Sequence, residues 1–280
     1  MIARLICIAL CLLATPAAAQ EQDATDTPAE KLKKMRAGML PRNVITSFNR
    51  RTVDSSEPPW RAIGRVNIGG RAHCSGALVG DDIVLTAAHC LYSKRTRAMV
   101  VPGIVHFLAG YAKGAYAAHS KVKAYLTPPE FDGAKGANEA NLPHDWALMT
   151  LEHPIGKTEG FLKLHINLRS GPPKTPTRQP LLNTASVTTA GYPGDRPHLL
   201  SLEEKCGIQK IYARARVFLT NCVALKGDSG GPVLQLEKEG YVLIGLQVAA
   251  IDVGRARASL GLSALAFRDA MVALQDTGAP

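Results

Sequence analysis

The sequence lacks any apolar run long enough to cross a membrane. The apolar run near the N-terminus, Leu5–Ala14, has ten residues, whereas a spanning helix needs about 20. Arg4 precedes this run, and the small residues Ala17–Ala19 follow it. This order is typical of a signal peptide over residues 1–19, cleaved before Gln20. We therefore expect a secreted or periplasmic protein with no membrane anchor once the signal is removed.

Aromatic residues are also scarce, at 5% of the chain. The formal net charge is +10, and the loss of Arg4 with the signal leaves about +9. The basic residues are scattered, and the sequence has neither a recognised nucleic-acid motif nor the clustered aromatics of a base-stacking surface. We expect no nucleic-acid partner, and we expect the chain to act as a monomer.

Cysteine is sparse, and its spacing excludes the common metal sites. Two of the six cysteines leave with the signal. The remaining four show no C-x-x-C spacing, and the sequence has no H-E-x-x-H motif, so we predict no metal and no cofactor. An even number of cysteines in an exported chain predicts two disulfides. Three pairings are possible, and the simplest joins the sequence neighbours, Cys74–Cys90 and Cys206–Cys222.

The chain changes character along its length. Residues 20–52 are first acidic and then basic, bury little, and are predicted to be a flexible leader or pro-segment. Residues 53–280 form the predicted folded domain. Residues 170–180 contain four prolines and no apolar periodicity, as in a linker. Short apolar or β-branched runs lie on both sides of it: 62–66, 74–79, 83–86, 104–108 and 146–151, then 186–190, 208–217, 232–236 and 241–250.

These runs predict an all-β protein with two packed barrels. The first barrel would span about 60–165 and the second about 181–255. A C-terminal helix over about 263–275 is predicted from Phe267, Met271 and Leu274, which share one helical face.

The strongest motif is Gly227-Asp-Ser-Gly-Gly-Pro232. A serine hydroxyl is a poor nucleophile unless a base lies beside it. Attack on a carbonyl also needs donors for the oxyanion that forms. The glycine before Asp228 lets the backbone turn, so that the amides of Gly227 and Ser229 can face one point. The motif predicts a nucleophilic Ser229 with its own oxyanion hole.

Two further motifs supply the partners that a nucleophilic serine requires. Thr86-Ala-Ala-His-Cys90 places His89 directly after an apolar strand, where it can act as the base. His144-Asp-Trp-Ala-Leu-Met149 places Asp145 at the opening of another strand. A partly buried carboxylate needs a partner, and a histidine N–H is a suitable one. We predict that His89, Asp145 and Ser229 form a catalytic triad.

Together the three motifs, in the order His, Asp, Ser, resemble the trypsin-like, chymotrypsin-fold serine peptidases. Cys74-Ser-Gly-Ala-Leu-Val79 is also similar to a strand of that family. Gly191-Tyr-Pro-Gly194 and the spacing from Cys222 to Ser229 resemble the bacterial branch that includes the glutamyl endopeptidases. The resemblance implies two antiparallel six-stranded barrels with the active site between them. It also implies a serine endopeptidase that hydrolyses protein or peptide substrates through an acyl-enzyme.

The resemblance also suggests which residues bind substrate. Val223 falls where trypsin has the acidic floor of its specificity pocket, and Val248, Ala249 and Ala250 would form the wall. Gln247 falls where glutamyl endopeptidases have a histidine. These residues predict cleavage after small or medium apolar side chains, with Asp252 as an alternative source of a basic preference.

In the family, a new N-terminal amine pairs with the aspartate before the catalytic serine. That aspartate is Asp228 in this sequence, and the resemblance implies a new terminus after Arg50-Arg51, at Thr52 or Val53. The sequence has no I-V-G-G-like start at this point.

Two other classes of protein compete with a peptidase. Gly227-x-Ser229-x-Gly231 also fits the nucleophile motif of α/β-hydrolases, but that fold places its histidine after the serine, and no histidine follows His198. A protease-fold binding protein without activity remains possible from the sequence alone.

Overall fold

A computed structural model describes residues 50–165, 186–253 and 256–277. The chain divides into two compact units, Met1–Val44 and Ile45–Pro280, and every described residue belongs to the second. The predicted signal peptide, the predicted leader up to residue 49 and the predicted linker at 170–180 lie outside the described residues.

The first barrel is closed and has six antiparallel strands, in the order β2-β3-β4-β9-β8-β7. In β2, buried Ile63, Val66 and Ile68 flank the less buried Arg65 and Asn67. This alternation is expected where one face of a strand lines a core. The strands are β2 (Ile63–Ile68), β3 (Ala72–Leu78), β4 (Ile83–Thr86), β7 (Val105–Ala109), β8 (Ala118–Leu126) and β9 (Ala147–Leu151).

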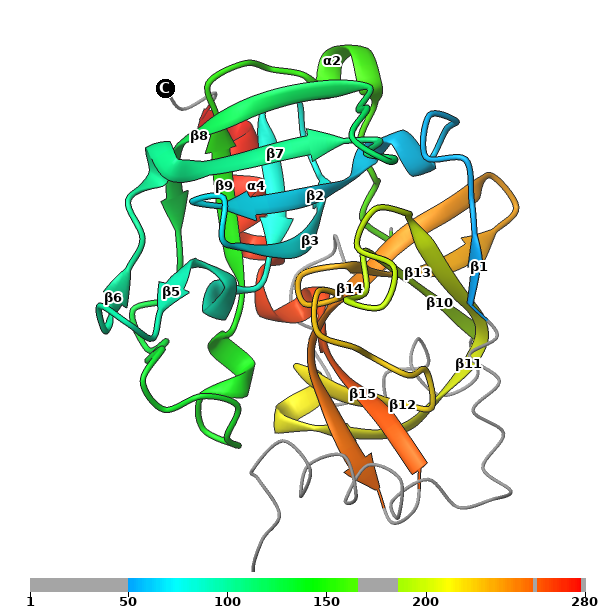
Figure 1. Ribbon diagram of the computed structural model, residues 1–280. Helices are drawn as coiled ribbons and strands as arrows, with labels where there is room; N and C mark the ends of the chain where they lie inside the picture. The colour runs from blue at the N-terminus through cyan, green and yellow to red at the C-terminus, as the bar shows by residue number, and fades with distance from the viewer. Residues whose placement is uncertain (1–49, 166–185, 254–255, 278–280) are drawn as a thin grey trace, which may run out of the picture. The chain divides into compact units, whose positions relative to one another are not determined.

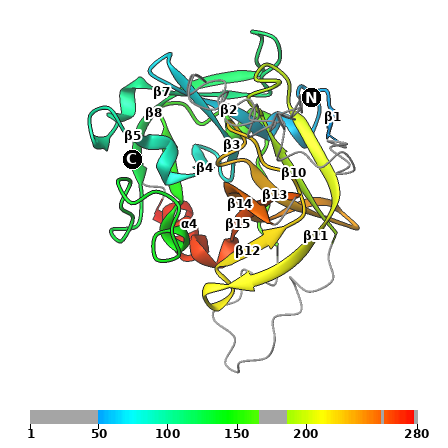
Figure 2. The ribbon, with the colours of Figure 1, turned by 60° about the horizontal axis from the view of Figure 1, so that its bottom comes forward.

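The second barrel also closes, because β11 pairs with both β10 and β12. Its strands are β10 (Ser186–Gly191), β11 (Ser201–Tyr212), β12 (Val217–Thr220), β13 (Pro232–Glu237), β14 (Gly240–Val253) and β15 (Ala256–Ser263). A short strand, β1 (Arg50–Thr52), adds to the first half of β11 in antiparallel register. Figure 1 shows β1 beside β11, and Figures 1 and 2 show the two barrels side by side.

The remaining elements are short. Strands β5 (Tyr92–Ser93) and β6 (Ala98–Met99) form a small separate hairpin. The helices are α2 (Gly156–Glu159), α4 (Arg268–Thr277) and the 3-10 turns η1 (Trp60–Ala62), η2 (Ala88–Leu91), η3 (Pro102–Ile104), η4 (Leu142–His144), η6 (Ala213–Ala215) and η7 (Ala264–Ala266).

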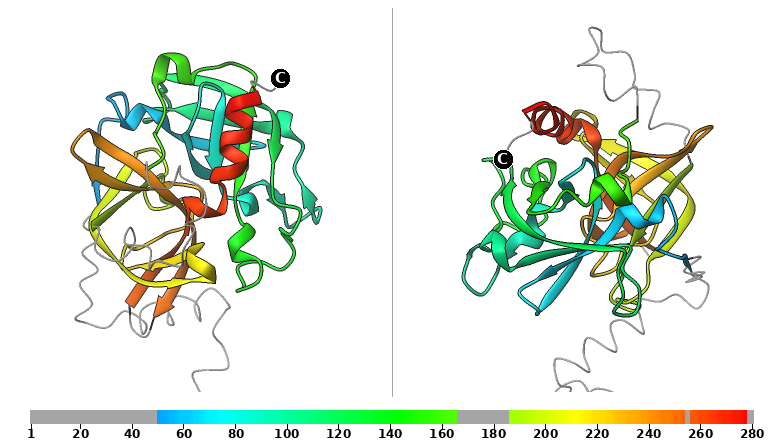
Figure 3. Two further views of the ribbon diagram at one scale, coloured as in Figure 1. Left: turned by 180° about the vertical axis from the view of Figure 1, so that it is seen from behind. Right: turned by 90° about the horizontal axis from the view of Figure 1, so that it is seen from above.

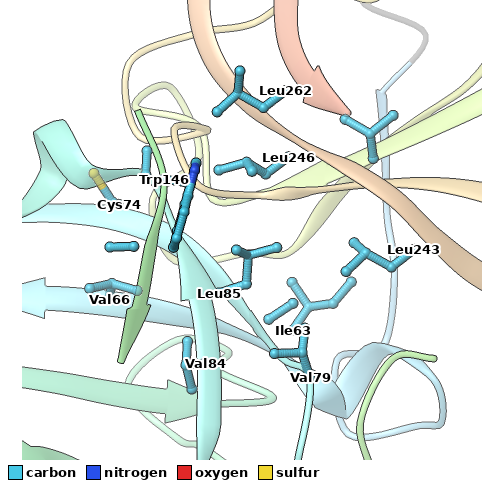
Figure 4. Close-up of a cluster of buried hydrophobic side chains, with 14 of the residues drawn as sticks. Ile63, Val66, Cys74, Val79, Val84, Leu85, Trp146, Leu243, Leu246 and Leu262 are labelled. Atoms are coloured by element: carbon cyan, nitrogen blue, oxygen red, sulfur yellow. The ribbon is translucent and has the colours of Figure 1, made fainter. Parts of the chain in front are cut away.

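The buried apolar side chains of both barrels belong to one cluster. Figure 4 shows Leu85 and Trp146 of the first barrel in the same group as Leu243, Leu246 and Leu262 of the second. Burial of apolar surface is the dominant favourable term in folding. The two barrels therefore fold against each other, and segments from either one can be held at fixed positions between them.

Helix α4 connects the end of the second barrel to the first. It lies against the first barrel in Figure 3. Phe267, just before α4, packs on Trp146 with ring centroids 6.5 Å apart. Gln275 Nε2 donates a hydrogen bond of 2.6 Å to the carbonyl of Val79. Within the described residues, no helix is long and apolar enough to cross a membrane.

The structure confirms the predicted all-β fold with two six-stranded antiparallel barrels and a C-terminal helix. Several boundaries differ. Residues 50–52, expected in the leader, form β1; the second barrel continues to Ser263 rather than about 255; and the helix is Arg268–Thr277 rather than about 263–275. Strand β15 begins with Ala-Arg-Ala-Ser, which has little apolar character and gave no strand signal.

Both disulfides join the sequence neighbours, as predicted. Cys74–Cys90 links β3 to η2, and Cys206–Cys222 links β11 to the residues that follow β12. Each pair has a sequence separation of 16.

We expect the double replacement Cys206→Ser and Cys222→Ser to lower the free energy of unfolding by about 3 kcal/mol, because a cross-link of this length restricts the unfolded chain by that amount. The matched control is Cys74→Ser with Cys90→Ser, since its equal separation predicts an equal entropic loss. Urea unfolding under non-reducing conditions measures both. A loss below about 1 kcal/mol in either variant contradicts the chain-entropy account.

Candidate active site

His89 is placed by the end of β4 and the turn η2. Ala87 and Ala88, which precede it, are fully buried. Small side chains at these two positions let the turn pack closely under the imidazole. The His89 side chain itself is 36% exposed. The His89 ring therefore packs on the buried turn and is partly open to solvent.

Asp145 lies between η4 and β9 and holds His89 at two points. Its Oδ2 atom lies 2.7 Å from His89 Nδ1, and its Oδ1 atom accepts a hydrogen bond of 2.8 Å from the backbone N–H of His89. A carboxylate can only accept, so Nδ1 carries the hydrogen and Nε2 is left as the acceptor. This is the tautomer that a general base needs.

Ser229 lies in the segment between β12 and β13 and is tied to both barrels. Its carbonyl accepts a hydrogen bond of 2.9 Å from the amide of Ser75 on β3. The next residue, Gly230, donates from its amide to the carbonyl of Gln247 on β14, at 2.7 Å. Gly230 has φ +81°, and a Cβ there would collide with Thr86 Oγ1 and the carbonyl of Ser75. The serine segment therefore approaches the first barrel as closely as a glycine allows.

The imidazole of His89 and the backbone of Ser229 both lie close to one disulfide sulfur. Cys90 Sγ lies 3.9 Å from His89 Nε2 and 3.8 Å from the carbonyl oxygen of Ser229. Among the described residues, no hydrogen bond joins the Ser229 hydroxyl to His89. In enzymes without bound substrate such bonds are often long and tighten on binding. The three predicted triad residues are thus gathered at one place, with Ser229 partly exposed.

Ser75, which the sequence analysis did not single out, is the main link between the barrels at this site. Its hydroxyl donates to the carbonyl of Gly227 at 2.8 Å and accepts from the amide of Tyr192 at 2.8 Å. Gly227 has φ +100°. Within the described part of the chain, neither the Gly227 amide nor the Ser229 amide donates a hydrogen bond. Both amides remain available as oxyanion donors.

The residues expected to bind substrate come from two segments. Val223 is partly buried after β12, whereas Val248, Ala249 and Ala250 follow one another on β14, from buried to exposed. Gln247 is 1% exposed; its Oε1 atom accepts from Ser259 Oγ at 3.4 Å, and its Nε2 atom has no hydrogen-bond partner among the residues that the structure describes. The side chain of Asp252 lies outside what the structure describes.

With this geometry established, the comparisons identify the family. A family model described as Trypsin matches residues 49–260. The chain belongs to the trypsin family. The predicted resemblance to this family is confirmed, and the chain is also similar to a bacterial glutamyl endopeptidase. A glutamyl endopeptidase of Bacillus licheniformis is 28% identical over 180 residues, which cover 61% of this chain and 49% of that protein.

Other similar proteins are more distant. Serine protease 56 of Homo sapiens is 26% identical over 210 residues, which cover 68% of this chain and 32% of the human protein. The chain thus spans about half of the bacterial relative and about a third of the human one. A solved Glu endopeptidase in complex with MPD matches with a TM-score of 0.64 at 18% identity. The match covers 81% of this chain and 96% of the endopeptidase chain. Protease Anisep from Arthrobacter nicotinovorans has a TM-score of 0.54 at 19% identity, with coverage of 74% and 92%. Both solved structures share the fold.

A buried ion pair beside the serine was also missed by the sequence analysis of this trypsin-family chain. Asp228 is 0% exposed, and both of its carboxylate oxygens contact the guanidinium of Arg50, at 2.9 and 2.8 Å. Glu203 Oε2 lies 3.6 Å from Arg50 Nε. Burial raises the pKa of Asp228 and of Glu203, and the charge of Arg50 opposes both shifts. The available sequence signal was the Arg50-Arg51 pair, which was interpreted as a cleavage point.

The described residues also bring possible metal ligands together twice. One group is Cys74, His89 and Cys90, and the other is Glu203, Cys206 and Cys222. In both groups the two sulfurs form a disulfide. Because metal binding requires thiolates, these sulfurs are unsuitable ligands while oxidised.

We expect Gly230→Ala to lower stability by about 1–3 kcal/mol more than Gly240→Ala, because its new Cβ meets backbone and side-chain atoms of the first barrel. Gly240 is the matched control: its φ is +118°, but a Cβ there meets nothing within 4 Å. Its replacement therefore costs only the backbone strain, about 1–2 kcal/mol. Chemical unfolding of the two variants measures the difference, and equal losses contradict the close approach at Gly230.

Proposed function

We propose that this chain is a secreted or periplasmic serine endopeptidase that uses His89, Asp145 and Ser229 as its catalytic triad. The observation that carries the proposal is the double contact of Asp145 with the Nδ1 atom and the backbone amide of His89, beside the serine of the Gly-Asp-Ser-Gly-Gly-Pro motif. Protein or peptide substrates are expected from the family and from the name of the bacterial relative.

In the proposed reaction, His89 Nε2 takes the proton of the Ser229 hydroxyl as Oγ bonds to the scissile carbonyl carbon. The Gly227 and Ser229 amides stabilise the oxyanion. His89 then gives its proton to the leaving amine, the C–N bond breaks, and an acyl-enzyme remains. Water, deprotonated by the same histidine, releases the acid and restores the serine. Asp145 stabilises the imidazolium in each half of the reaction.

The competing function is a binding protein with the protease fold and no activity. Such a protein would need a blocked or dismantled site. The partial exposure of His89 and Ser229 favours the enzyme, as do the amides of Gly227 and Ser229, which donate no hydrogen bond to any residue that the structure describes.

Ser229→Ala and His89→Ala should each lower kcat by about 10⁶-fold, because neither residue alone can replace the pair. Ser186→Ala, at an exposed serine, is the control and should leave the rate unchanged. EDTA should leave hydrolysis largely intact. A fluorophosphonate probe should label the wild-type protein at Ser229, and full activity in Ser229→Ala would refute the mechanism.

We further propose that the enzyme cleaves after small or medium apolar residues. Val223, Val248 and Ala249 carry no charge, so a buried basic side chain of the substrate would lose its hydration without gaining a partner. Gln247 is neutral, in contrast to a protonated histidine that could pair with a glutamate. Digestion of a peptide library should therefore show Ala and Val enriched before the cut, and a strong preference for Arg, Lys or Glu would contradict this.

A further inference from the structure

The ion pair at Asp228 lies in residues 223–229, the catalytic segment, which carries the proposed nucleophile and both proposed oxyanion donors. A buried carboxylate next to the nucleophile is unfavourable without a partner of opposite charge. In the family this partner is a new N-terminal amine. Here the side chain of Arg50 forms an ion pair with the Asp228 carboxylate instead. The Arg50 side chain is 1% exposed and that of Asp228 is 0% exposed.

The carboxylate of Asp228 is fully engaged. Oδ1 accepts from Arg50 Nη1 at 2.9 Å, and Oδ2 contacts Arg50 Nη2 at 2.8 Å. Oδ2 also accepts from the amide of Leu225 at 2.8 Å. A two-point pairing of this kind is geometrically specific to arginine. A second cation could reach Asp228 only by displacing Arg50.

The guanidinium also supports the other end of the same segment. Arg50 Nη2 donates to the carbonyl of Val223 at 2.6 Å. The amide of Val223 donates to Glu203 Oε2 at 2.8 Å. Arg50 therefore connects the start of the segment, Val223, to Asp228, one residue before the nucleophile, and holds the backbone that carries the amide of Gly227.

Backbone pairing fixes Arg50 in this place. Arg50 lies opposite Glu203 in the β1–β11 pairing, and its carbonyl accepts from Arg196 Nη1 at 3.3 Å. The pairing continues into Val53, whose amide donates to the carbonyl of Leu200 at 3.2 Å. A terminus made at Thr52 or Val53 would have to leave this register to reach Asp228. Cleavage there would also separate Arg50 from the domain.

We propose that Arg50 is a built-in positioning residue that replaces the activating N-terminal amine of the family. The enzyme is then competent as long as Arg50 stays attached, and cleavage after Arg50 or Arg51 turns it off. This inference rests on the proposed serine peptidase function and concerns only how its oxyanion segment is kept in shape.

The first test compares three variants of the exported chain beginning at Gln20. Arg50→Met should lower the rate of fluorophosphonate labelling per folded molecule, and kcat/KM, by about 10²–10³-fold, the effect of losing one oxyanion donor. Arg50→Lys should recover part of the loss, because it keeps the charge without the two-point pairing. Arg51→Met is the matched control. Its side chain is exposed and pairs with Glu204 at 2.7 Å, so its rates should stay within about threefold of wild type.

A residue that only stabilised the fold would change the melting temperature but leave the labelling rate of the folded molecules intact. Millimolar guanidinium ion added to Arg50→Gly gives a second readout. It should raise the labelling rate, whereas the same concentration of sodium should not. Equal labelling rates for wild type and Arg50→Met, per folded molecule, overturn the inference.

The second test does not depend on any substitution at Arg50. Intact-mass analysis of wild-type enzyme after brief labelling should find Arg50 retained in the labelled molecules, and a chain made to begin at Thr52 should label at least about 10²-fold more slowly. Labelling confined to molecules that begin at Thr52 or Val53 overturns the inference while leaving the peptidase proposal standing. Failure of every wild-type form to label rejects the peptidase proposal itself.

Discussion

A negative charge buried directly before the proposed nucleophile, Ser229, is the constraint on which the site depends. Asp228 has no contact with solvent, so its ionised form requires a cation within hydrogen-bond reach. Arg50 provides it, and the pairing of the three-residue strand β1 with β11 places Arg50 within reach of Asp228. Strand β1, Glu203 and residues 223–228 all contact the Arg50 guanidinium that neutralises this carboxylate, or the backbone beside it.

The proposed active site also requires both barrels. His89 and Asp145 come from the first, and Ser229 comes from the second. Neither barrel alone carries all three side chains. Their relative position is set by shared apolar packing around Leu85, Trp146 and their partners in the second barrel. Polar contacts between the barrels add to it, as in the hydrogen bond from the amide of Ser75 to the carbonyl of Ser229. Apolar packing thus stabilises the contact between the barrels, and the hydrogen bonds fix how the site residues are oriented within it.

Much of the proposed site could be predicted from the sequence because each of its residues lies in a short contiguous motif. The turns that carry His89, Asp145 and Ser229 each have local requirements for small or apolar neighbours, and these leave a pattern. The disulfide pairs could also be predicted, because the two cysteines of each pair are close in sequence. Arg50 was not predictable: its partner is 178 residues away, and only the folded register of β1 on β11 brings them together. Strand β15 was missed because it starts with polar and small residues.

Ser75 and Arg50 hold the same catalytic segment through complementary groups. Ser75 binds the carbonyls of Gly227 and Ser229, with its hydroxyl and its amide respectively, and Arg50 binds the carbonyl of Val223 and the side chain of Asp228. The carbonyls of Val223, Gly227 and Ser229 thus have partners within the protein, whereas the Gly227 and Ser229 amides donate no hydrogen bond within the described residues. An oxyanion hole needs donors that are fixed before the reaction begins. Hydrogen bonds that hold the carbonyls of this segment would also fix the two amides that we propose as oxyanion donors.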